Sequence, residues 1–254
     1  NIAGHLNNGF NWNVYATVKN AKDYSNAYDG KVLNSRFSEK NMGGYVGINK
    51  SWGYSHILVS SFDQNVGMIE GERDATTGHF LMYPGTTAER PATNQDLTSS
   101  DFLFPGQKIN HFKIASDNNI ALSKGRLAFN IAYQRNQRKE YADYLTPTTP
   151  ALYFDLSTIN YTLQYHAPEK NGWKTSIGLN GMQQENKNKA DEVLIPAYKQ
   201  FDAGVFYYTK KTFAQKTTIS GGLRSDFRNV QGDAYYEGAV QKFSAFNKQL
   251  FNVS

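Results

Sequence analysis

The chain has 254 residues, no cysteine, 17 tyrosines and 16 phenylalanines, so disulfides, zinc–cysteine sites and thiol catalysis are excluded. Its 27 basic residues are dispersed among 22 acidic ones despite a net charge of +5, and we therefore expect no nucleic-acid partner. The mean hydropathy is −0.61 and no apolar run approaches the roughly 18 residues of a membrane helix, but a membrane-spanning strand needs an apolar residue only at every second position.

Extended segments with a period of two follow one another along the chain. In 126–136, for example, Leu127, Phe129 and Ile131 alternate with small or polar residues, which is typical of a strand with one apolar face. No linker separates these segments, so 1–254 is expected to form a single all-β domain. The predicted strands, about ten in number, are 8–19, 41–51, 53–65, 106–122, 126–138, 152–166, 173–186, 199–210, 213–228 and a last one from about 243.

The connections between these strands alternate between short and long. The short ones are predicted at 51–53, 123–125, 168–172 and 210–212, and the long ones at 20–40, 66–106, 139–151, 187–198 and 229–242. An antiparallel up-and-down sheet then carries every short turn at one end and every long loop at the other. Outer-membrane barrels show this asymmetry.

The apolar faces need a cover, which is either a second protein layer or lipid. A soluble sandwich would explain the alternation equally well. However, the predicted strands run to about 12 residues, whereas globular strands average about 5–6. Aromatic residues also gather near the short turns, as the interfacial girdle of a membrane barrel requires: Phe10, Trp12, Trp52, Tyr54, Tyr165, Trp173, Tyr207 and Phe213. The pattern favours a transmembrane β-barrel.

Several of these segments resemble the barrel of TonB-dependent outer-membrane receptors, particularly those of the Bacteroidetes type. The resemblance runs over essentially the whole chain and depends on the order and spacing of the segments rather than on one motif. The segments are Gly43–Gly53 (GGYVGINKSWG), Ser60–Asp63 (SSFD), Gln107–Lys113 (QKINHFK), Tyr133–Glu140 (YQRNQRKE), Leu194–Tyr198 (LIPAY) and Ser220–Arg228 (SGGLRSDFR).

The resemblance implies a barrel of 22 strands, an N-terminal plug domain and energy supplied by the TonB complex. Members of the family carry scarce ligands such as iron chelates, haem, cobalamin or oligosaccharides across the outer membrane. The present segment shows neither a plug nor a TonB box, so we expect a partial barrel domain that is incomplete at both ends. The expected partners are outer-membrane lipid, the protein's own plug, the TonB complex and a small ligand such as a ferric chelate; a surface lipoprotein is an open alternative.

Polar residues near the long-loop ends of two strands are candidate ligand contacts on the lumen face. They are Gln134, Asn136, Arg138, Arg224 and Arg228. Guanidinium groups can hold an anionic ligand through paired hydrogen bonds. The alternative is that these residues belong, together with Asp226, to an ion-pair network that holds the plug.

Loop 66–106 is the best candidate for a ligand-facing cap, because uncommitted loops of this size are usually functional or disordered. Within it, His79, Phe80 and Tyr83 are candidate contacts, and His79 is a weak candidate for an axial haem ligand. We find no metal motif, nucleophile elbow or phosphate loop, so neither an enzyme nor a cofactor is expected. The expected function is uptake of a scarce ligand such as a ferric siderophore; the alternatives are a passive porin-like barrel and a soluble glycan-binding module.

Overall fold

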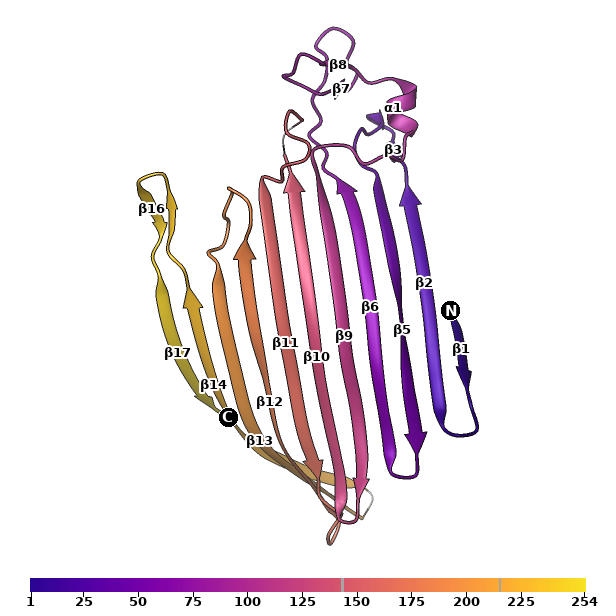
Figure 1. The fold of residues 1–254 in the computed structure, drawn as a ribbon, viewed down its shortest axis with the longest axis vertical. Coiled ribbons are helices and arrows are strands. Elements are labelled where there is room, and N and C mark those ends of the chain that lie inside the picture. Colours follow the sequence, from indigo (N-terminus) through magenta and orange to yellow (C-terminus); the bar gives the residue numbers. More distant parts are fainter. Residues whose placement is uncertain (143, 215) are drawn as a thin grey trace.

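The chain forms a single curved sheet, seen in a computed structural model that describes residues 1–142, 144–214 and 216–254. Within that part of the chain the sheet has 11 strands, and all neighbouring strands are antiparallel. Each strand pairs with the strand of this sheet that comes next along the chain (Figure 1). The sheet is not closed, because β1 and β17 lie at its two edges. In order, the strands are β1 (Ile2–His5), β2 (Phe10–Ala21), β5 (Phe37–Lys50), β6 (Gly53–Gly67), β9 (Gly106–Leu122), β10 (Gly125–Tyr141), β11 (Leu152–His166), β12 (Trp173–Asn188), β13 (Tyr198–Phe213), β14 (Thr217–Gly232) and β17 (Phe246–Val253).

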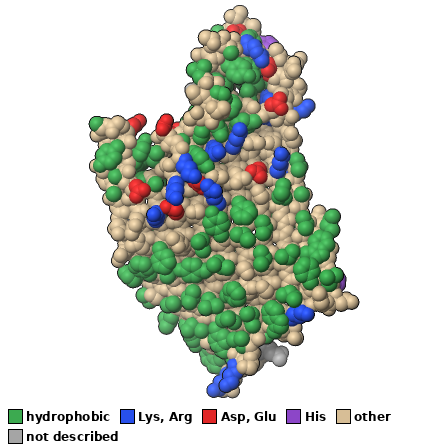
Figure 2. Space-filling view, in the orientation of Figure 1, with side chains coloured by type: hydrophobic (Ala, Val, Ile, Leu, Met, Phe, Trp, Pro, Cys, Tyr) green, Lys and Arg blue, Asp and Glu red, His purple; other side chains and the backbone are tan. Residues whose placement is uncertain are grey.

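The register keeps the apolar residues of neighbouring strands on the same side. Ile131 pairs with Tyr161 in β11, for example, while Ala132 on the opposite face pairs with Ala115 and Asn160. Figure 2 shows the resulting band of hydrophobic side chains across one face of the sheet. Since side chains alternate between faces along every strand, the other face is the polar one.

The apolar face has no protein cover in the described residues. Ile131 is 50% exposed, Ile177 54% and Leu223 70%. The buried hydrophobic side chains instead gather at the long-loop end of the sheet: Val32, Leu33, Phe80, Met82, Ala92, Tyr141 and Leu152. A soluble sandwich would bury its apolar faces between two layers, so this architecture matches the expected barrel wall and not the sandwich.

Short and long connections are sorted to opposite ends, as the sequence predicts. The short turns are at 6–9, 51–52, 123–124, 167–172 and 214–216, and the long connections are 22–36, 68–105, 142–151, 189–197 and 233–245. The long connections carry three small hairpins: β3 (Ser25–Asn26) with β4 (Gly30–Lys31), β7 (Leu81–Met82) with β8 (Arg90–Pro91), and β15 (Tyr235–Glu237) with β16 (Val240–Phe243). They also carry α1 (Asn94–Thr98), the one helix of the described residues, which is too short to cross a membrane.

Two local predictions are wrong, and one short strand was missed. The turn expected at 210–212 lies inside β13, and the chain reverses after Phe213, where Ala214 takes a left-handed φ of 46° although it is not a glycine. The short strand β1 was not predicted. Tyr54 lies on the polar face, where its ring stacks on His56 at 4.9 Å, so it is not part of an outward aromatic girdle.

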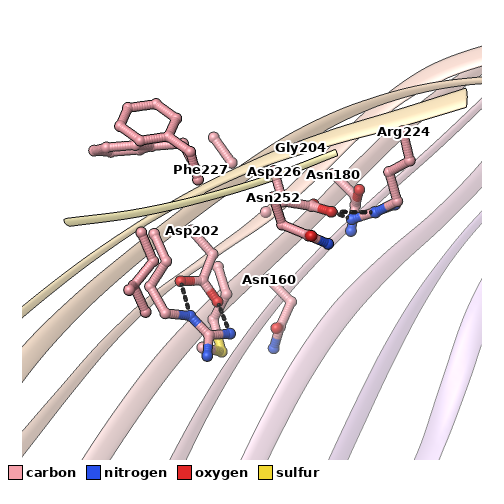
Figure 3. A pocket seen from close by; sticks show the side chains of 14 residues that line it. Asn160, Asn180, Asp202, Gly204, Arg224, Asp226, Phe227 and Asn252 are labelled. Carbon is pink, nitrogen blue, oxygen red and sulfur yellow. Dashed lines mark hydrogen bonds and ion pairs between the residues drawn. The ribbon is translucent and has the colours of Figure 1, made fainter. Parts of the chain in front are cut away.

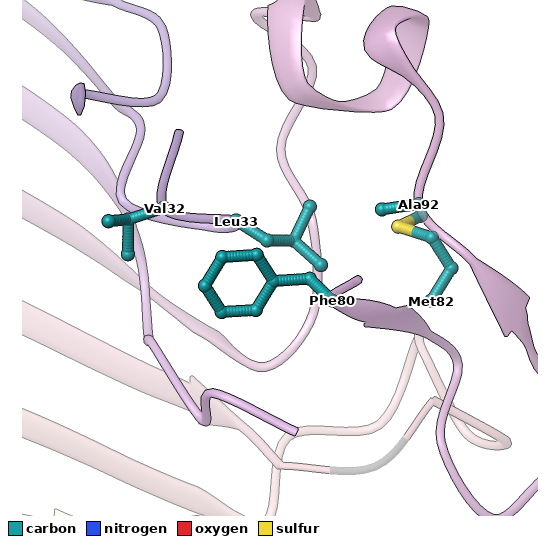
Figure 4. Close-up of a cluster of buried hydrophobic side chains, with 5 residues drawn as sticks. All are labelled: Val32, Leu33, Phe80, Met82 and Ala92. Atoms are coloured by element: carbon teal, nitrogen blue, oxygen red, sulfur yellow. The ribbon is translucent and has the colours of Figure 1, made fainter. Parts of the chain in front are cut away.

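Connections 22–36 and 68–105 fold together into a small unit above the sheet, called here the loop subdomain. Val32 and Leu33 from the first connection pack against Phe80, Met82 and Ala92 from the second (Figure 4). Because these buried contacts hold the two connections against each other, the subdomain has its own small hydrophobic core over the end of the sheet.

A buried ion pair within connection 22–36 holds the guanidinium group that reaches the second connection. Arg36 donates to Asp23 at 2.5 Å, and the two side chains are 5% and 0% exposed. The same guanidinium donates to the carbonyl oxygens of Asp96 and Asp101 at 2.6 and 3.3 Å. Asn34 completes the junction by donating to the carbonyls of Met68 and Pro105 at 2.9 and 2.7 Å.

Candidate ligand-facing surface

The polar face of strands β11 to β17 forms a hollow of about 540 Å³ (Figure 3). The register brings Asn160, Met182, Asp202 and Arg228 into one row, one from each of four adjacent strands. Amide, carboxylate and guanidinium groups therefore line a surface that faces away from the apolar band.

Two ion pairs occupy this hollow. Arg228 Nε and Nη2 donate to the two carboxylate oxygens of Asp202 at 2.9 and 2.8 Å, and Arg224 does the same with Asp226 at 2.7 and 2.5 Å. Each guanidinium is thus held in a two-point contact with one carboxylate. The four charges cancel, so an anionic ligand would have to compete with Asp202 and Asp226 for these arginines.

Glycine at position 204 makes this arrangement sterically feasible. A Cβ atom there would lie 2.2 Å from Asp226 Oδ1 and 2.8 Å from Arg224 Nη2. Neither Gly204 nor Asp202 was predicted from the sequence, although an isolated glycine within a strand pattern is a signal for the close approach of another group.

A second polar group lies on β10 and its neighbours. Asn136 Nδ2 is 3.2 Å from His111 Nδ1, and Arg138 Nη2 donates to Glu140 at 3.2 Å. Two polar atoms of this face, Arg138 Nε and Asn180 Oδ1, are buried without a hydrogen-bond partner among the described residues. Such groups are costly when left unpaired, and they would gain from a partner inside the lumen.

The structure separates the predicted site residues into three groups. Gln134, Asn136 and Arg138 share the polar face of β10, whereas Arg224 and Arg228 lie on β14. Strands β11, β12 and β13 stand between the two, a span of about 19 Å at the usual spacing of roughly 4.8 Å per strand. The expectation that Arg224 lies near the long-loop end is wrong: it sits midway along β14, in register through the sheet with Ala128 near the start of β10.

The loop candidates form the third group, in the loop subdomain. His79 is exposed, while Phe80 is only 7% exposed and lies under the guanidinium of Arg73, 3.9 Å from the ring centroid. Phe80 therefore packs the core of the subdomain and cannot touch a ligand in this arrangement. Tyr83 is half-buried and makes an edge contact with Tyr144 at 5.8 Å between centroids.

Tyr144 ties connection 142–151 to the loop subdomain. Its hydroxyl donates to Glu70 at 2.9 Å. Burial, followed by this hydrogen bond to a carboxylate, raises the pKa of Tyr144 above its ordinary value, so the phenol stays protonated and remains a donor. No cluster of three metal-ligating side chains occurs in the described part of the chain.

Comparison with known proteins gives a fold but no sequence family. No protein-family model matches the chain, and no curated protein matches it. Solved structures of the FrpB iron transporter from Neisseria meningitidis do match, covering 99% of this chain: the F5-1 variant at TM-score 0.65 and 13% identity, its apoprotein form at 0.64 and 13%, and the F3-3 variant at 0.64 and 14%.

The chain spans 39–40% of the length of these structures. The similarity establishes that the antiparallel up-and-down sheet has the fold of an outer-membrane barrel wall. At 13–14% identity it shows the fold alone.

Proposed function

We propose that this chain is part of the barrel wall of a TonB-dependent transporter in the bacterial outer membrane. One observation carries the proposal: among the residues that the structure describes, nothing covers the apolar face of the single sheet, yet this sheet matches a known outer-membrane barrel over 99% of the chain. Such a face requires a cover, because large contiguous apolar surfaces are not left exposed to water. Lipid supplies that cover in outer-membrane barrels, whose outward faces carry an apolar band.

The unpaired edges at β1 and β17 support a larger barrel. Unsatisfied backbone groups of a sheet edge cost several kcal/mol each in lipid. We therefore regard 1–254 as a partial barrel domain whose remaining strands close the sheet. A plug domain inside that barrel would offer partners to Arg138 Nε and Asn180 Oδ1, and its displacement would require the TonB complex. A surface lipoprotein partner stays a prediction.

The proposed cargo is a ferric siderophore or a similar anionic iron chelate. The matched proteins are described as iron transporters. Three arginines on the polar face would suit an anionic ligand that displaces their carboxylate partners Glu140, Asp226 and Asp202. The proposed contacts are Arg138, Arg224, Arg228, Gln134 and Asn136 in the lumen and His79 and Tyr83 at the rim. The Bacteroidetes-type assignment stays a prediction, since the matched structures come from Neisseria meningitidis.

The test is uptake by cells that carry the full-length protein containing this chain. Cells deleted for its gene and complemented with the wild type should accumulate radiolabelled ferric chelate under iron limitation, and should stop when tonB is deleted. Equal uptake with and without TonB would overturn the active mechanism and favour the passive porin-like barrel. Purification as a soluble monomer without detergent would overturn the barrel itself and favour the glycan-binding module.

A paired variant tests the lumen site. Replacing Arg228 alone would leave Asp202 unpaired, so the double variant R228Q/D202N, which keeps hydrogen-bonding groups but no charge, is preferable. Its matched control is K174Q/E169Q, a charge pair 3.6 Å apart at the short-turn end. We expect the Kd for the ferric chelate to be higher in R228Q/D202N than in the wild type and unchanged in K174Q/E169Q.

A further inference from the structure

The outward face turns basic where its apolar band ends, on the side of the long loops. On β10, Leu127 to Tyr133 belong to the apolar band, and Arg135, Gln137 and Lys139 continue the same face towards the long loops. Figure 2 shows this change, with lysine and arginine side chains gathered above the hydrophobic band. The transition is therefore a property of the sheet surface and not of the loops.

Lysines from neighbouring strands line up in this region. Lys108 of β9 pairs with Lys139, which pairs with Tyr153 of β11, and the Lys189 backbone N–H donates to the Tyr153 carbonyl at 2.9 Å. The three lysines thus form a row that runs from β9 over β10 and β11 to the residue directly after β12, with about 4.8 Å between strands.

Positive charge exceeds negative charge across this surface, called here the basic belt. Seven basic residues face outward together with three acidic ones, an excess of four charges. The basic residues are Lys40, Lys108, Arg135, Lys139, Lys187, Lys189 and Lys199, and the acidic ones are Asp63, Asp155 and Glu185.

The acidic groups do not neutralise the belt. Asp155 is shared by Arg135 and Lys189, at 2.6 and 2.5 Å. Lys139 and Lys189 lie over the ring of Tyr153, 4.8 and 5.5 Å from its centroid, which orients the ammonium groups without cancelling their charge. Within the described residues, neither Lys108 nor Lys139 forms an ion pair. The belt therefore keeps charge available for an anion.

We propose that the basic belt binds the phosphate groups of lipid headgroups in the leaflet on the long-loop side. The inference rests on the proposed membrane location, because the apolar band then fixes the depth of the acyl chains and the belt lies at the headgroup level. Cationic residues at this depth attract anionic headgroups. A surface hollow of about 340 Å³, lined among others by Lys40, Lys108 and Lys139, gives a phosphate group room to approach all three.

The test compares phosphorylated with dephosphorylated lipid on the full-length protein in mild detergent. The variant is K108Q/K139Q/K189Q, and the matched control is K124Q/K170Q/K216Q, in which three exposed lysines of the short turns lose the same charge. The probe is diphosphorylated lipid A, with its dephosphorylated form as reference, and bound lipid is counted by native mass spectrometry.

We expect the wild type and the control to retain phosphorylated lipid and the belt variant to bind it about tenfold or more weakly, since each surface lysine contributes about fivefold. Equal binding by the wild type and the belt variant would overturn the proposal, as would equal binding of the two lipid forms by the wild type. Competition by millimolar inorganic phosphate would point to a free-phosphate site and would also overturn it.

Two further measurements keep the result interpretable. If the belt variant fails to assemble, the wild type alone decides: raising salt from 50 to 500 mM should release phosphorylated lipid, and salt-independent retention contradicts the proposal. TonB-independent uptake together with selective lipid retention would contradict the transport function while supporting the belt.

Discussion

At the scale of single residues, Arg36 is the polar side chain on which the loop subdomain most depends. Replacing it by Met leaves the Asp23 carboxylate, which is 0% exposed, without a cation. Removing one partner of a buried ion pair costs about 3–5 kcal/mol. We expect R36M to open residues 68–105 to hydrogen exchange while the strands stay protected.

The matched control for R36M is R73M. Arg73 pairs with Asp29 at 2.6 Å, but the two side chains are 35% and 26% exposed, so water replaces the lost ion pair and that loss costs less than about 1 kcal/mol. Methionine keeps an apolar side chain over the Phe80 ring, which the Arg73 guanidinium covers at 3.9 Å. Exchange rates in 68–105 that rise equally in both variants would contradict the role assigned to the buried pair.

Asp96 should make the loop subdomain sensitive to acid. Its carboxylate accepts hydrogen bonds from Arg90 and from the N-cap residue Thr93, and the Arg90 contact is the main cause of a pKa held well below the usual range of an aspartate. A group whose pKa is lower in the folded state stabilises that state fully above its unfolded pKa and loses this contribution as pH falls through the folded value.

We therefore expect exchange protection in 90–99 to be constant from pH 7 to 5 and to decline below about pH 4. In D96N the same segment should be less protected at pH 7, and the difference from the wild type should shrink as pH falls. A difference that stays the same at pH 3 would contradict this assignment.

Sequence alternation predicted the face on which each polar residue lies and grouped Arg224 with Asp226 in an ion-pair network, but it did not predict the partner of Arg228. Arg224 and Arg228 were placed on the polar face from their spacing. Asp226 lies on the same strand as its partner Arg224. Asp202 lies on the neighbouring strand and meets Arg228 through the β13–β14 register, which the periodicity of a single strand cannot predict. Phe80 was misjudged for a related reason, because burial inside a loop has no periodic signature.

At the scale of elements, connection 68–105 is predicted to cap the ligand vestibule. Deleting 72–100 removes Phe80, Met82 and Ala92 but leaves the β6–β9 ladder and the Met68–Pro105 backbone hydrogen bond in place. We expect the barrel to assemble and the Kd for the ferric chelate to rise at least about tenfold, or 1.4 kcal/mol. Deleting hairpin 235–243 is the control, and unchanged uptake after the first deletion would contradict the prediction.

The long strands were largely predictable because their signal is local and repeated. The ranges 106–122 and 152–166 coincide with β9 and β11, since a strong turn signal marks each end. The turn after β13 was misplaced because Lys210 and Lys211 are polar, whereas the actual reversal uses Ala214. The fold of the loop subdomain could not be predicted, because it depends on contacts between 22–36 and 68–105 that no repeating pattern encodes.

At the scale of the whole molecule, stability should depend on what covers the apolar face. The buried core lies in the loop subdomain and at the adjoining strand ends, so the middle of the sheet gains little from protein packing and must gain from lipid. The barrel wall and the loop subdomain should therefore respond to different perturbations, the first to the depth of a charge in the bilayer and the second to acid or loss of Arg36.

The adjacent positions 131 and 132 offer a direct test of this dependence. Ile131 lies within the apolar band and is 50% exposed, whereas Ala132 faces the lumen on the opposite side of the same strand. An arginine on the lipid face near the bilayer midplane costs about 2–4 kcal/mol, while lumen substitutions leave the lipid contact unchanged. We expect I131R to lower the folded fraction of the full-length protein after refolding into phosphatidylcholine vesicles, measured by heat-modifiable electrophoretic mobility in a urea series. A132R should refold almost as well as the wild type. If I131R and A132R lose stability equally, the apolar band is not in contact with lipid, and the barrel wall would need a protein partner on its outer face instead.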